Sequence, residues 1–518
     1  MKISKSFFLS LCIVLLGVIL RGYRLEELFH FTYDEEVFAF IGRRMWVQGH
    51  IPLIGGVTPM HVHLAPYFYW LSGVILRLGD FIPTIWGAAG LVLAGITMGL
   101  IYHTGKTIFS PKVGLLAQLF YAVSFGINLY DRHYWGLLFN PLFSVIVFFC
   151  LWKIVRKEKW YFYILALTLS VAFHFDPSTL VLYLVSFFVL LYRRVLTAKF
   201  ILSGIAIFVA VLAPLIAFDI RHKGENIRGW NQYLKELKTQ DTKHSSSFIS
   251  NALVLPKTLA RTLAIDGPVD LAEQYSYCKP YVSKRLNQTP PWAVGITIII
   301  FVTGAWYLYK RSKKEKNALS ILYIYFFSVL VGITIYGTFF GGDLFDHYLT
   351  TALPLFALLV GFVFTKNFNR FMPLAFILGM LFILSNISSL HNAYHSYGYT
   401  TKKEAIDWVQ SHVGETPFSL ESLGSCYKFM GYRYLFAVHG REPVKSYVDQ
   451  NFFYVFDTLP AEKHPPITVV MVNKSNYEDA EFASSYNHFL GGAIQKKAFG
   501  GFEVLIIDNT SGKYDGNF

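Results

Sequence analysis

The sequence FFLSLCIVLLGVIL at residues 7–20, followed by YDEE at residues 33–36, decides the expected fold of this chain. The first segment is apolar and follows the cations Lys2 and Lys5. Because positive charge tends to stay in the cytoplasm, we expect a first helix that crosses the membrane outward. The carboxylates of the second segment then lie just outside the membrane. A carboxylate at the lipid–water boundary is costly to hold there, so Asp34 is the first candidate functional residue.

The composition indicates a membrane protein with many spans. Hydrophobic residues make up 54% of the 518 residues, charged residues only 15%, and mean hydropathy is +0.41. These values exclude an ordinary soluble globule. The net charge of +13 would suggest nucleic acid in a soluble protein. Here much of it falls in short loops predicted to be cytoplasmic, so membrane lipids are the expected partner and nucleic acid is not.

Ten further apolar segments follow the first one, which predicts about 11 spans. The loops that alternate to the inner side are rich in Lys and Arg, as in residues 310–316. The short loops on the outer side are not. This asymmetry predicts a cytoplasmic N-terminus and an outer C-terminus in the plasma membrane. The ten predicted spans are 81–103, 113–130, 137–152, 160–174, 179–192, 200–218, 292–309, 318–336, 348–365 and 371–389.

The first outer loop, residues 21–80, contains a helical pattern that begins near Asp34. Asp34 would cap this helix, with Glu35 and Glu36 in its first turn, where the helix dipole favours anions. Successive helical residues project about 100° apart, so Glu35 and Glu36 cannot both face one site. We expect Glu36 to be solvated.

Two more segments are predicted to lie outside. Residues 219–291 are polar and interrupted by Gly and Pro. Residues 391–518 lose the long apolar runs and contain strand-like stretches at 467–472 and 502–507, with a helical pattern at 401–412. We therefore expect a multi-spanning domain at 1–390 and a small extracytoplasmic α/β domain at 391–518.

The order of these features resembles the GT-C membrane glycosyltransferases. The shared features are a first helix, an outer loop that opens with Asp-Glu, an interfacial helix and a Pro-plus-aromatic run before the second full span. Further similarities are Asn140-Pro141, His174-Phe175-Asp176-Pro177, Phe218-Asp219-Ile220-Arg221-His222 after Pro214, and His347-Tyr348-Leu349 before Pro354. The chain is most similar to bacterial relatives of protein O-mannosyltransferases and of the lipid A aminoarabinose transferases.

This resemblance implies an inverting glycosyltransferase that takes a hexose or pentose from a polyprenyl-phosphate donor. The acceptor would be a glycan, lipid or protein on the extracytoplasmic side. A hydroxyl is a poor nucleophile, so a positioned carboxylate is needed to accept its proton. The resemblance assigns that catalytic role to Asp34 with Glu35. The leaving lipid phosphate needs cationic or polar contacts.

Several outer residues could bind the substrates, and each also has a structural explanation. The basic candidates for the donor phosphate could instead snorkel among lipid headgroups, and the candidates for the sugar could be interfacial anchors. The phosphate candidates are Arg132, His133, Arg221 and His222, and the sugar candidates are His61, His63, His347 and Tyr348. A divalent metal ion is left open, since Asp34, Glu35 and one histidine could supply ligands.

A transporter or flippase of lipid-linked sugars would have the same hydropathy. Transporters usually contain inverted repeats and ionisable residues near the middle of their spans. Here the polar residues collect at the outer ends of the predicted spans, which favours the transferase. A sensor with a ligand-binding tail is a third alternative, and the large number of spans argues weakly against it.

Overall fold

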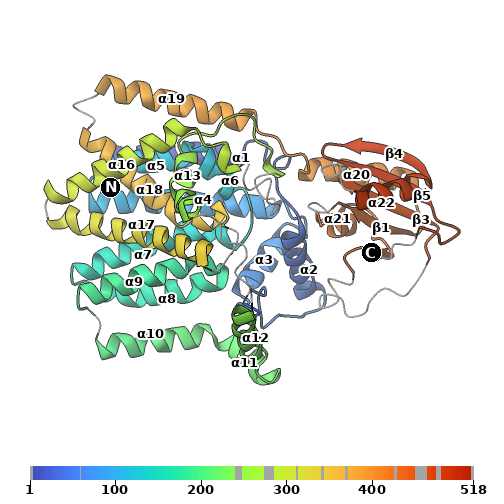
Figure 1. Ribbon diagram of the computed structural model, residues 1–518, viewed down its shortest axis with the longest axis horizontal. Coiled ribbons are helices and arrows are strands. Elements are labelled where there is room, and N and C mark those ends of the chain that lie inside the picture. Colours follow the sequence, from blue (N-terminus) through green and yellow to red (C-terminus); the bar gives the residue numbers. More distant parts are fainter. Residues whose placement is uncertain are drawn as a thin grey trace.

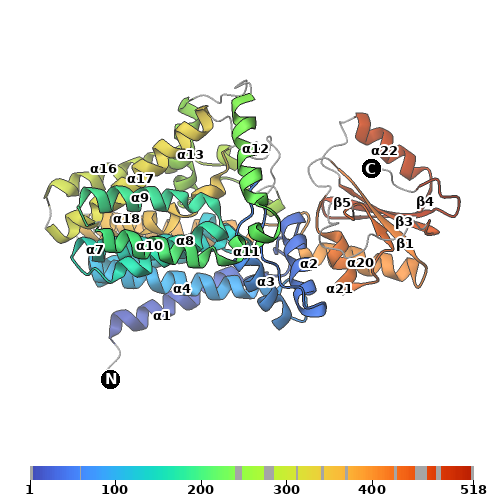
Figure 2. The same cartoon turned by 90° about the horizontal axis from the view of Figure 1, so that it is seen from below.

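The computed structural model describes residues 4–58, 60–195, 197–239, 248–272, 285–310, 313–339, 344–367, 372–424, 429–449, 464–473 and 480–514. A bundle of long helices occupies one end of the molecule and an α/β region the other (Figure 1). Helices α2 (Tyr33–Val47) and α3 (Tyr67–Leu78) lie between these two parts in both views (Figure 2).

The bundle is built from helices that match the predicted apolar segments closely. These bundle helices are α1 (Lys5–Gly22), α4 (Ile85–Ile108), α5 (Pro111–Val123), α6 (Phe125–Asp131), α7 (Asn140–Val155), α8 (Tyr161–Phe175), α9 (Leu180–Tyr192), α10 (Ala198–Val211), α11 (Ala213–Arg221), α16 (Pro291–Lys310), α17 (Lys313–Phe339), α18 (Ala352–Asn367) and α19 (Met372–His391). Three 3₁₀ turns connect some of them, namely η1 (Gly136–Phe139), η2 (Pro177–Thr179) and η3 (Asp346–Leu349).

The lengths of these helices are consistent with a multi-pass membrane protein. Five described helices are long and apolar enough to cross a membrane, or up to seven if each bent pair counts as one span. Helices α8, α9, α18 and α19 are apolar but shorter. The number of about 11 spans therefore stays a prediction.

Two predicted spans are bent rather than straight. The segment 113–130 turns by 70° between α5 and α6, where the Ser124 side chain caps the second helix by accepting the N–H of Ile127. The segment 200–218 turns by 58° between α10 and α11. Pro214 stands in the first turn of α11, where its missing N–H breaks the ladder of the preceding helix.

The second outer segment is more regular than its composition suggested. Residues 219–291 contain α12 (Glu225–Thr239) and α13 (Phe248–Arg261). The charged residues of α12 lie largely on its exposed side, whereas α13 buries Val254, Leu255 and Leu259 against the bundle. Amphipathic packing has thus stabilised α13, whereas the apolar residues Ile227 and Trp230 of α12 are exposed.

The described C-terminal part contains a five-stranded sheet and three helices, and its being a separate extracytoplasmic domain at 391–518 stays a prediction. Its mixed sheet has the order β2-β1-β3-β5-β4, with β1 parallel to β2 and β3, and β5 antiparallel to β3 and β4. The strands are β1 (Phe418–Leu423), β2 (Lys445–Ser446), β3 (Ile467–Asn473), β4 (Ala493–Phe499) and β5 (Phe502–Asp508). The helices are α20 (Tyr399–Val413), α21 (Tyr432–His439) and α22 (Ala480–Leu490).

This α/β region contacts the helical part at α2 and the loop before it. The buried Lys402 amine donates hydrogen bonds to the main-chain oxygens of Phe31 at 2.5 Å and Met430 at 2.6 Å. The main-chain N–H of Tyr434 donates to Glu36 Oε1 at 2.7 Å. The expectation that Glu36 is solvated is therefore wrong, because α21 covers its side of α2. Burial raises the pKa of Glu36 to about 7.

Candidate active site

The first turn of α2 is held by Thr32 rather than by Asp34. Thr32 is the N-cap residue, and its N–H and hydroxyl both donate to Glu35 Oε2, at 2.8 and 3.0 Å. The interpretation of Asp34 as the helix cap is therefore wrong. A Glu three residues after a Thr cap is a known signature of a helix start, so the sequence did contain this signal. Since Glu35 holds the turn, Asp34 is left out of the capping interactions.

Asp34 lines a cavity of about 330 Å³ between α2 and the bundle. Asp34 is an exposed residue, yet protein atoms are packed densely around its carboxylate. The resulting loss of hydration raises the pKa of Asp34 to about 7, and the negative charge of Glu35 adds to the effect. A carboxyl group with a pKa near neutrality is suited to accept a proton from a substrate.

Six stretches of the chain meet at this cavity, and half of its lining residues carry an aromatic or imidazole ring. These rings come from α2, α3, the segment after α6, α8 and η3, and the remaining lining residues are glycine, alanine, leucine and aspartate. The lining residues are Asp34, Phe38, Gly55, Gly56, Leu64, Ala65, Phe68, Tyr69, Trp135, Gly136, Leu137, His174, Phe175, Asp176, His347 and Tyr348. The structure therefore brings the predicted residues His347 and Tyr348 to the same cavity as Asp34.

Glu35 lies behind Asp34 in a buried polar cluster. His133 Nε2 donates to Glu35 Oε1 at 2.5 Å, and the His133 ring stacks on Trp135 at a centroid distance of 4.0 Å. Burial alone would raise the pKa of Glu35, but the neighbouring His133 and the hydrogen bonds from His133 and Thr32 lower it. Glu35 is thus an ionised carboxylate whose two oxygens already accept hydrogen bonds.

The ligand atoms of Glu35 and His133 lie within 4.8 Å of one another and of a ligand atom of His30. Imidazole and carboxylate groups at this separation could hold one divalent ion, and two histidines with a carboxylate suit Zn²⁺. The sequence left a metal site open, with Asp34, Glu35 and one histidine as possible ligands, and it did not point to His30.

The remaining phosphate candidates lie away from the cavity lining. The buried Arg132 donates to Asn128 Oδ1 at 2.7 Å and to the main-chain oxygens of Leu20 and Tyr23 at 2.8 and 2.7 Å. These contacts fasten α6 to the end of α1. Arg221 and His222 are exposed at the end of α11. The role of all three in phosphate binding stays a prediction.

The histidines of the first outer loop contact α12. His61 Nε2 lies 2.8 Å from Glu236 Oε2, and His63 Nε2 lies 3.4 Å from Glu225 Oε1. Neither histidine is among the described residues that line the Asp34 cavity. Their sugar-binding role also stays a prediction.

Sequence reasoning missed a buried cationic cluster directly behind His347. Arg261 forms an ion pair with Asp346, and Arg285 Nη2 lies 3.4 Å from Asp346 Oδ1. Tyr130 donates a hydrogen bond to Asp346 Oδ2 at 2.9 Å. Burial would raise the pKa of Asp346, but the two guanidinium groups hold it far below its usual range. Two cations therefore contact the carboxylate of Asp346, the residue next to His347 in the cavity wall.

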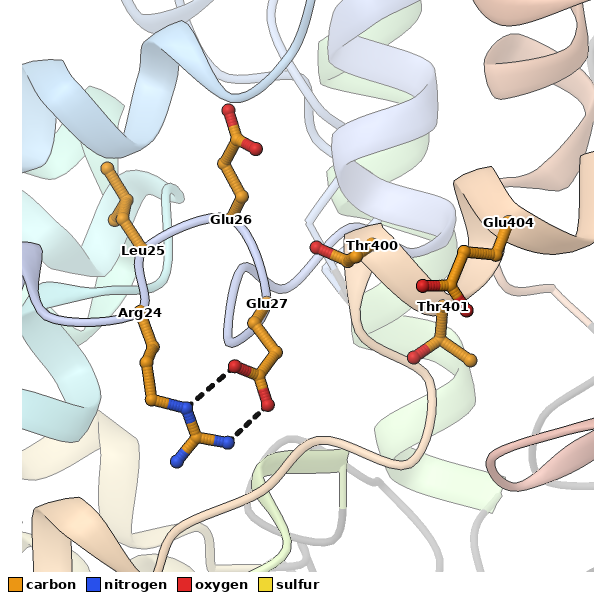
Figure 3. A pocket seen from close by; sticks show the side chains of 7 residues that line it. All are labelled: Arg24, Leu25, Glu26, Glu27, Thr400, Thr401 and Glu404. Atoms are coloured by element: carbon orange, nitrogen blue, oxygen red, sulfur yellow. Dashed lines mark hydrogen bonds and ion pairs between the residues drawn. The ribbon is translucent and has the colours of Figure 1, made fainter. Parts of the chain in front are cut away.

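A second hollow lies at the junction between the loop after α1 and the start of α20 (Figure 3). It has a volume of about 750 Å³ and is wide open to solvent. Arg24 and Glu27 form an ion pair on one side, and Thr400, Thr401 and Glu404 lie on the other. Arg24 Nη1 also donates to the main-chain oxygens of His391 and Ala393, at 3.0 and 2.9 Å. This hollow marks a junction of two parts of the chain. The Asp34 cavity is less open and is lined by more aromatic rings, so it is the candidate substrate site.

The fold is similar to that of ArnT from Cupriavidus metallidurans. The structure of that protein bound to undecaprenyl phosphate superposes with a TM-score of 0.61 at 12% identity, covering 98% of this chain and 99% of ArnT. The apo structure gives a TM-score of 0.58 at 11% identity, covering 99% and 100% of the two chains. The oligosaccharyltransferase AglB from Archaeoglobus fulgidus matches with a TM-score of 0.46 at 11% identity, over 98% of this chain and 75% of AglB.

No protein-family model and no curated protein matches the chain by sequence. The expected resemblance to the GT-C membrane glycosyltransferases is confirmed for the fold, which extends over nearly the whole chain.

Proposed function

We propose that the chain is an inverting glycosyltransferase that takes a sugar from a polyprenyl-phosphate donor, with Asp34 as the general base. The observation that carries this proposal is an accessible carboxylate with a pKa of about 7 in an enclosed aromatic cavity. The fold supports the same class, and ArnT, one of its structural neighbours, was crystallised with undecaprenyl phosphate. The rival assignment as a transporter or flippase does not need such a base.

In the proposed reaction the Asp34 carboxylate accepts the proton of an acceptor hydroxyl as its oxygen attacks the anomeric carbon. The new C–O bond forms while the bond from that carbon to the phosphate oxygen breaks, and the electron pair leaves with the lipid phosphate. A single displacement inverts the anomeric centre. General-base assistance of this kind contributes about 10²–10⁴-fold to the rate. We assign the base to Asp34 and not to Glu35, because the pKa of Glu35 is lowered and its oxygens already accept hydrogen bonds.

The size and wall of the cavity favour one sugar unit as the ligand. A volume of about 330 Å³ is near the lower limit of the usual range of about 300–1,000 Å³ for ligand sites. The negative faces of rings such as Tyr69 and Trp135 attract the weakly positive C–H groups of a sugar. His174 and Asp176 add polar groups to this wall. We therefore assign the cavity to the transferred sugar.

The leaving phosphate is assigned to the cationic cluster behind His347. Arg261 and Arg285 bring positive charge to the carboxylate of Asp346, which is the residue next to His347. Such a charge stabilises a phosphate as its bond to the sugar breaks. Burial lowers the pKa of His347 to about 3, so His347 can contribute a neutral hydrogen bond.

A divalent ion, if one binds, would be held by His30, Glu35 and His133. It would add positive charge beside Asp34 and so favour the ionised form of that base. The steps described above depend only on the side chains of the protein.

The proposed orientation has the N-terminus and residues 310–316 in the cytoplasm, and the site, residues 219–291 and residues 391–518 outside. The chain has four cysteines, so a cysteine-free background is practicable for labelling. A Ser312→Cys variant in that background should react with an impermeant maleimide only after lysis. Labelling in intact cells would contradict the orientation. Ser312 itself lies outside the described residues.

The test of the function is sugar transfer by the purified protein in lipid. Wild-type protein is incubated with a panel of radiolabelled polyprenyl-phosphate sugars and envelope acceptors, beside an Asp34→Asn variant. We expect the label to move from one donor to an acceptor with wild-type protein only. Movement of an intact labelled donor across sealed vesicles, without chemical transfer, would instead establish the flippase.

A further inference from the structure

A chain of hydrogen bonds joins the segment after α19 to the first turn of α2. It begins at His395, whose Nδ1 accepts the main-chain N–H of Tyr397 at 3.2 Å. The neutral ring must therefore carry its proton on Nε2. That nitrogen lies 3.2 Å from His30 Nδ1, to which it donates. His30 and His395, which are 365 positions apart in the sequence, are thus joined by a hydrogen bond.

The chain continues without a mismatch of donors and acceptors. Because His30 Nδ1 is an acceptor, its proton lies on Nε2, which donates to Thr32 Oγ1 at 3.2 Å. The Thr32 hydroxyl in turn donates to Glu35 Oε2 at 3.0 Å. His133 closes the chain from the other side by its hydrogen bond to Glu35 Oε1.

The surroundings keep this chain in one state. His30, Glu35, His133 and His395 are all at least 94% buried. The hydrogen bonds themselves indicate neutral rings, since His395 Nδ1 and His30 Nδ1 each accept a hydrogen bond and so carry no proton. A neutral ring with one nitrogen accepting and the other donating has a defined tautomer, and a misplaced ring would leave buried polar atoms unsatisfied.

From this arrangement we infer that His395 and His30 are positioning residues for sugar transfer. They fix the Thr32 hydroxyl and the Glu35 carboxylate, and these fix the turn of α2 that carries Asp34. The inference rests on the proposed role of Asp34. Neither histidine is among the described residues lining the cavity, so both act through Glu35. The segment that leads into the α/β region therefore helps to position the proposed base.

A metal ion at the same place would have different consequences. An imidazole nitrogen that binds a metal has no proton to donate. An ion shared by His30, Glu35 and His133 would therefore disrupt the bond from His30 to Thr32 or the bond from His395 to His30. The hydrogen-bond chain and the metal site are thus distinguishable by the metal content of the purified protein.

The decisive comparison is between His395→Gln and His395→Leu. The Gln side-chain amide can place an N–H where His395 Nε2 lies, whereas Leu fills similar space without a donor. Arg24→Met is the matched control, because Arg24 joins the same two parts of the chain through His391 and Ala393 without touching Glu35. Each variant is assayed for kcat and donor KM, and hydrogen–deuterium exchange is followed in residues 30–38.

We expect His395→Leu to lower kcat by about tenfold or more with little change in donor KM, since small misplacement of a catalytic group is costly. Exchange in the first turn of α2 should rise in this variant. His395→Gln and Arg24→Met should match the wild type in kcat and in exchange at residues 33–36.

Unchanged exchange and kcat in His395→Leu would overturn the inference, as would an equal loss in Arg24→Met. Stoichiometric divalent metal in the wild-type protein that is lost in His30→Phe would replace the hydrogen-bond chain by a metal site. A wild-type protein without transferase activity would refute the proposed function. The exchange measurement does not need sugar transfer, so it would still decide whether His395 holds the first turn of α2.

Discussion

His174 Nδ1 accepts a hydrogen bond from the main-chain N–H of Ala65 at 3.1 Å, and this contact fixes the tautomer of a histidine in the cavity wall. The neutral ring must carry its proton on Nε2. That nitrogen is buried and has no acceptor among the described residues. Leaving a buried donor without a partner is costly, and a sugar oxygen in the cavity would supply the missing acceptor.

The first prediction tests this use of His174. In His174→Asn the side-chain oxygen can still accept the Ala65 N–H, but the donor at Nε2 is lost. We expect an unchanged melting temperature. The donor KM should rise by about tenfold, which corresponds to the loss of one hydrogen bond worth about 1.4 kcal/mol. Steady-state kinetics and thermal unfolding measure the two quantities. A variant with wild-type donor KM would exclude His174 from sugar binding.

The second prediction compares two candidate phosphate ligands, the buried Arg285 and the exposed Arg221. Arg285→Lys keeps a positive charge beside Asp346 but loses the planar fork that suits a phosphate. We expect its kcat to fall by about tenfold to 10²-fold. Arg221→Ala should stay close to the wild type in kcat, because its side chain is exposed at the end of α11.

Both variants are assayed with the same donor, and circular dichroism checks that the helices are intact. The reverse result, with a large loss in Arg221→Ala and none in Arg285→Lys, would return the phosphate site to the position first indicated by the sequence.

Those features of the fold that depend on local sequence could be predicted. Hydropathy located the apolar helices from α4 to α11 and from α16 to α19, and strand-like runs located β3 and β5, since each pattern is contained within about twenty residues. The bends at Ser124 and Pro214 were missed, because an apolar run continues through both of them. Composition alone does not report the direction of a helix axis.

The candidate site was predictable only in part, for the same reason. Asp34 stood out by its position after the first span, and His347 and Tyr348 by their place at the outer end of another. Their common cavity depends on contacts between distant segments. The distant partners of Glu35 and Glu36, namely His133 and Tyr434, lie on segments whose contacts no local pattern could indicate. Thr32 with Glu35 was the one local signal that was overlooked.

The third prediction concerns the pH dependence of transfer. A general base acts only when it is ionised, and the pKa of Asp34 is raised to about 7. Below that pH the carboxyl group is protonated and cannot accept a proton, whereas above it the carboxylate is formed. We therefore expect kcat to rise with pH through about 7 and then to level off. A kcat that falls as the pH rises through this range would contradict Asp34 as the base.

The last prediction separates a catalytic from a structural role for Asp34. Because Thr32 caps α2, amide substitution of Asp34 should leave the helix intact, and Asp34→Asn should melt at the wild-type temperature. An amide cannot act as a base, so transfer should fall by about 10²-fold or more. Glu36→Gln is the matched control two residues along the same helix, since its amide oxygen can still accept the Tyr434 N–H. That variant should retain transfer. If Asp34→Asn transfers sugar at the wild-type rate, the base must be sought elsewhere in the cavity, and Asp176 is the next carboxylate in its wall to test.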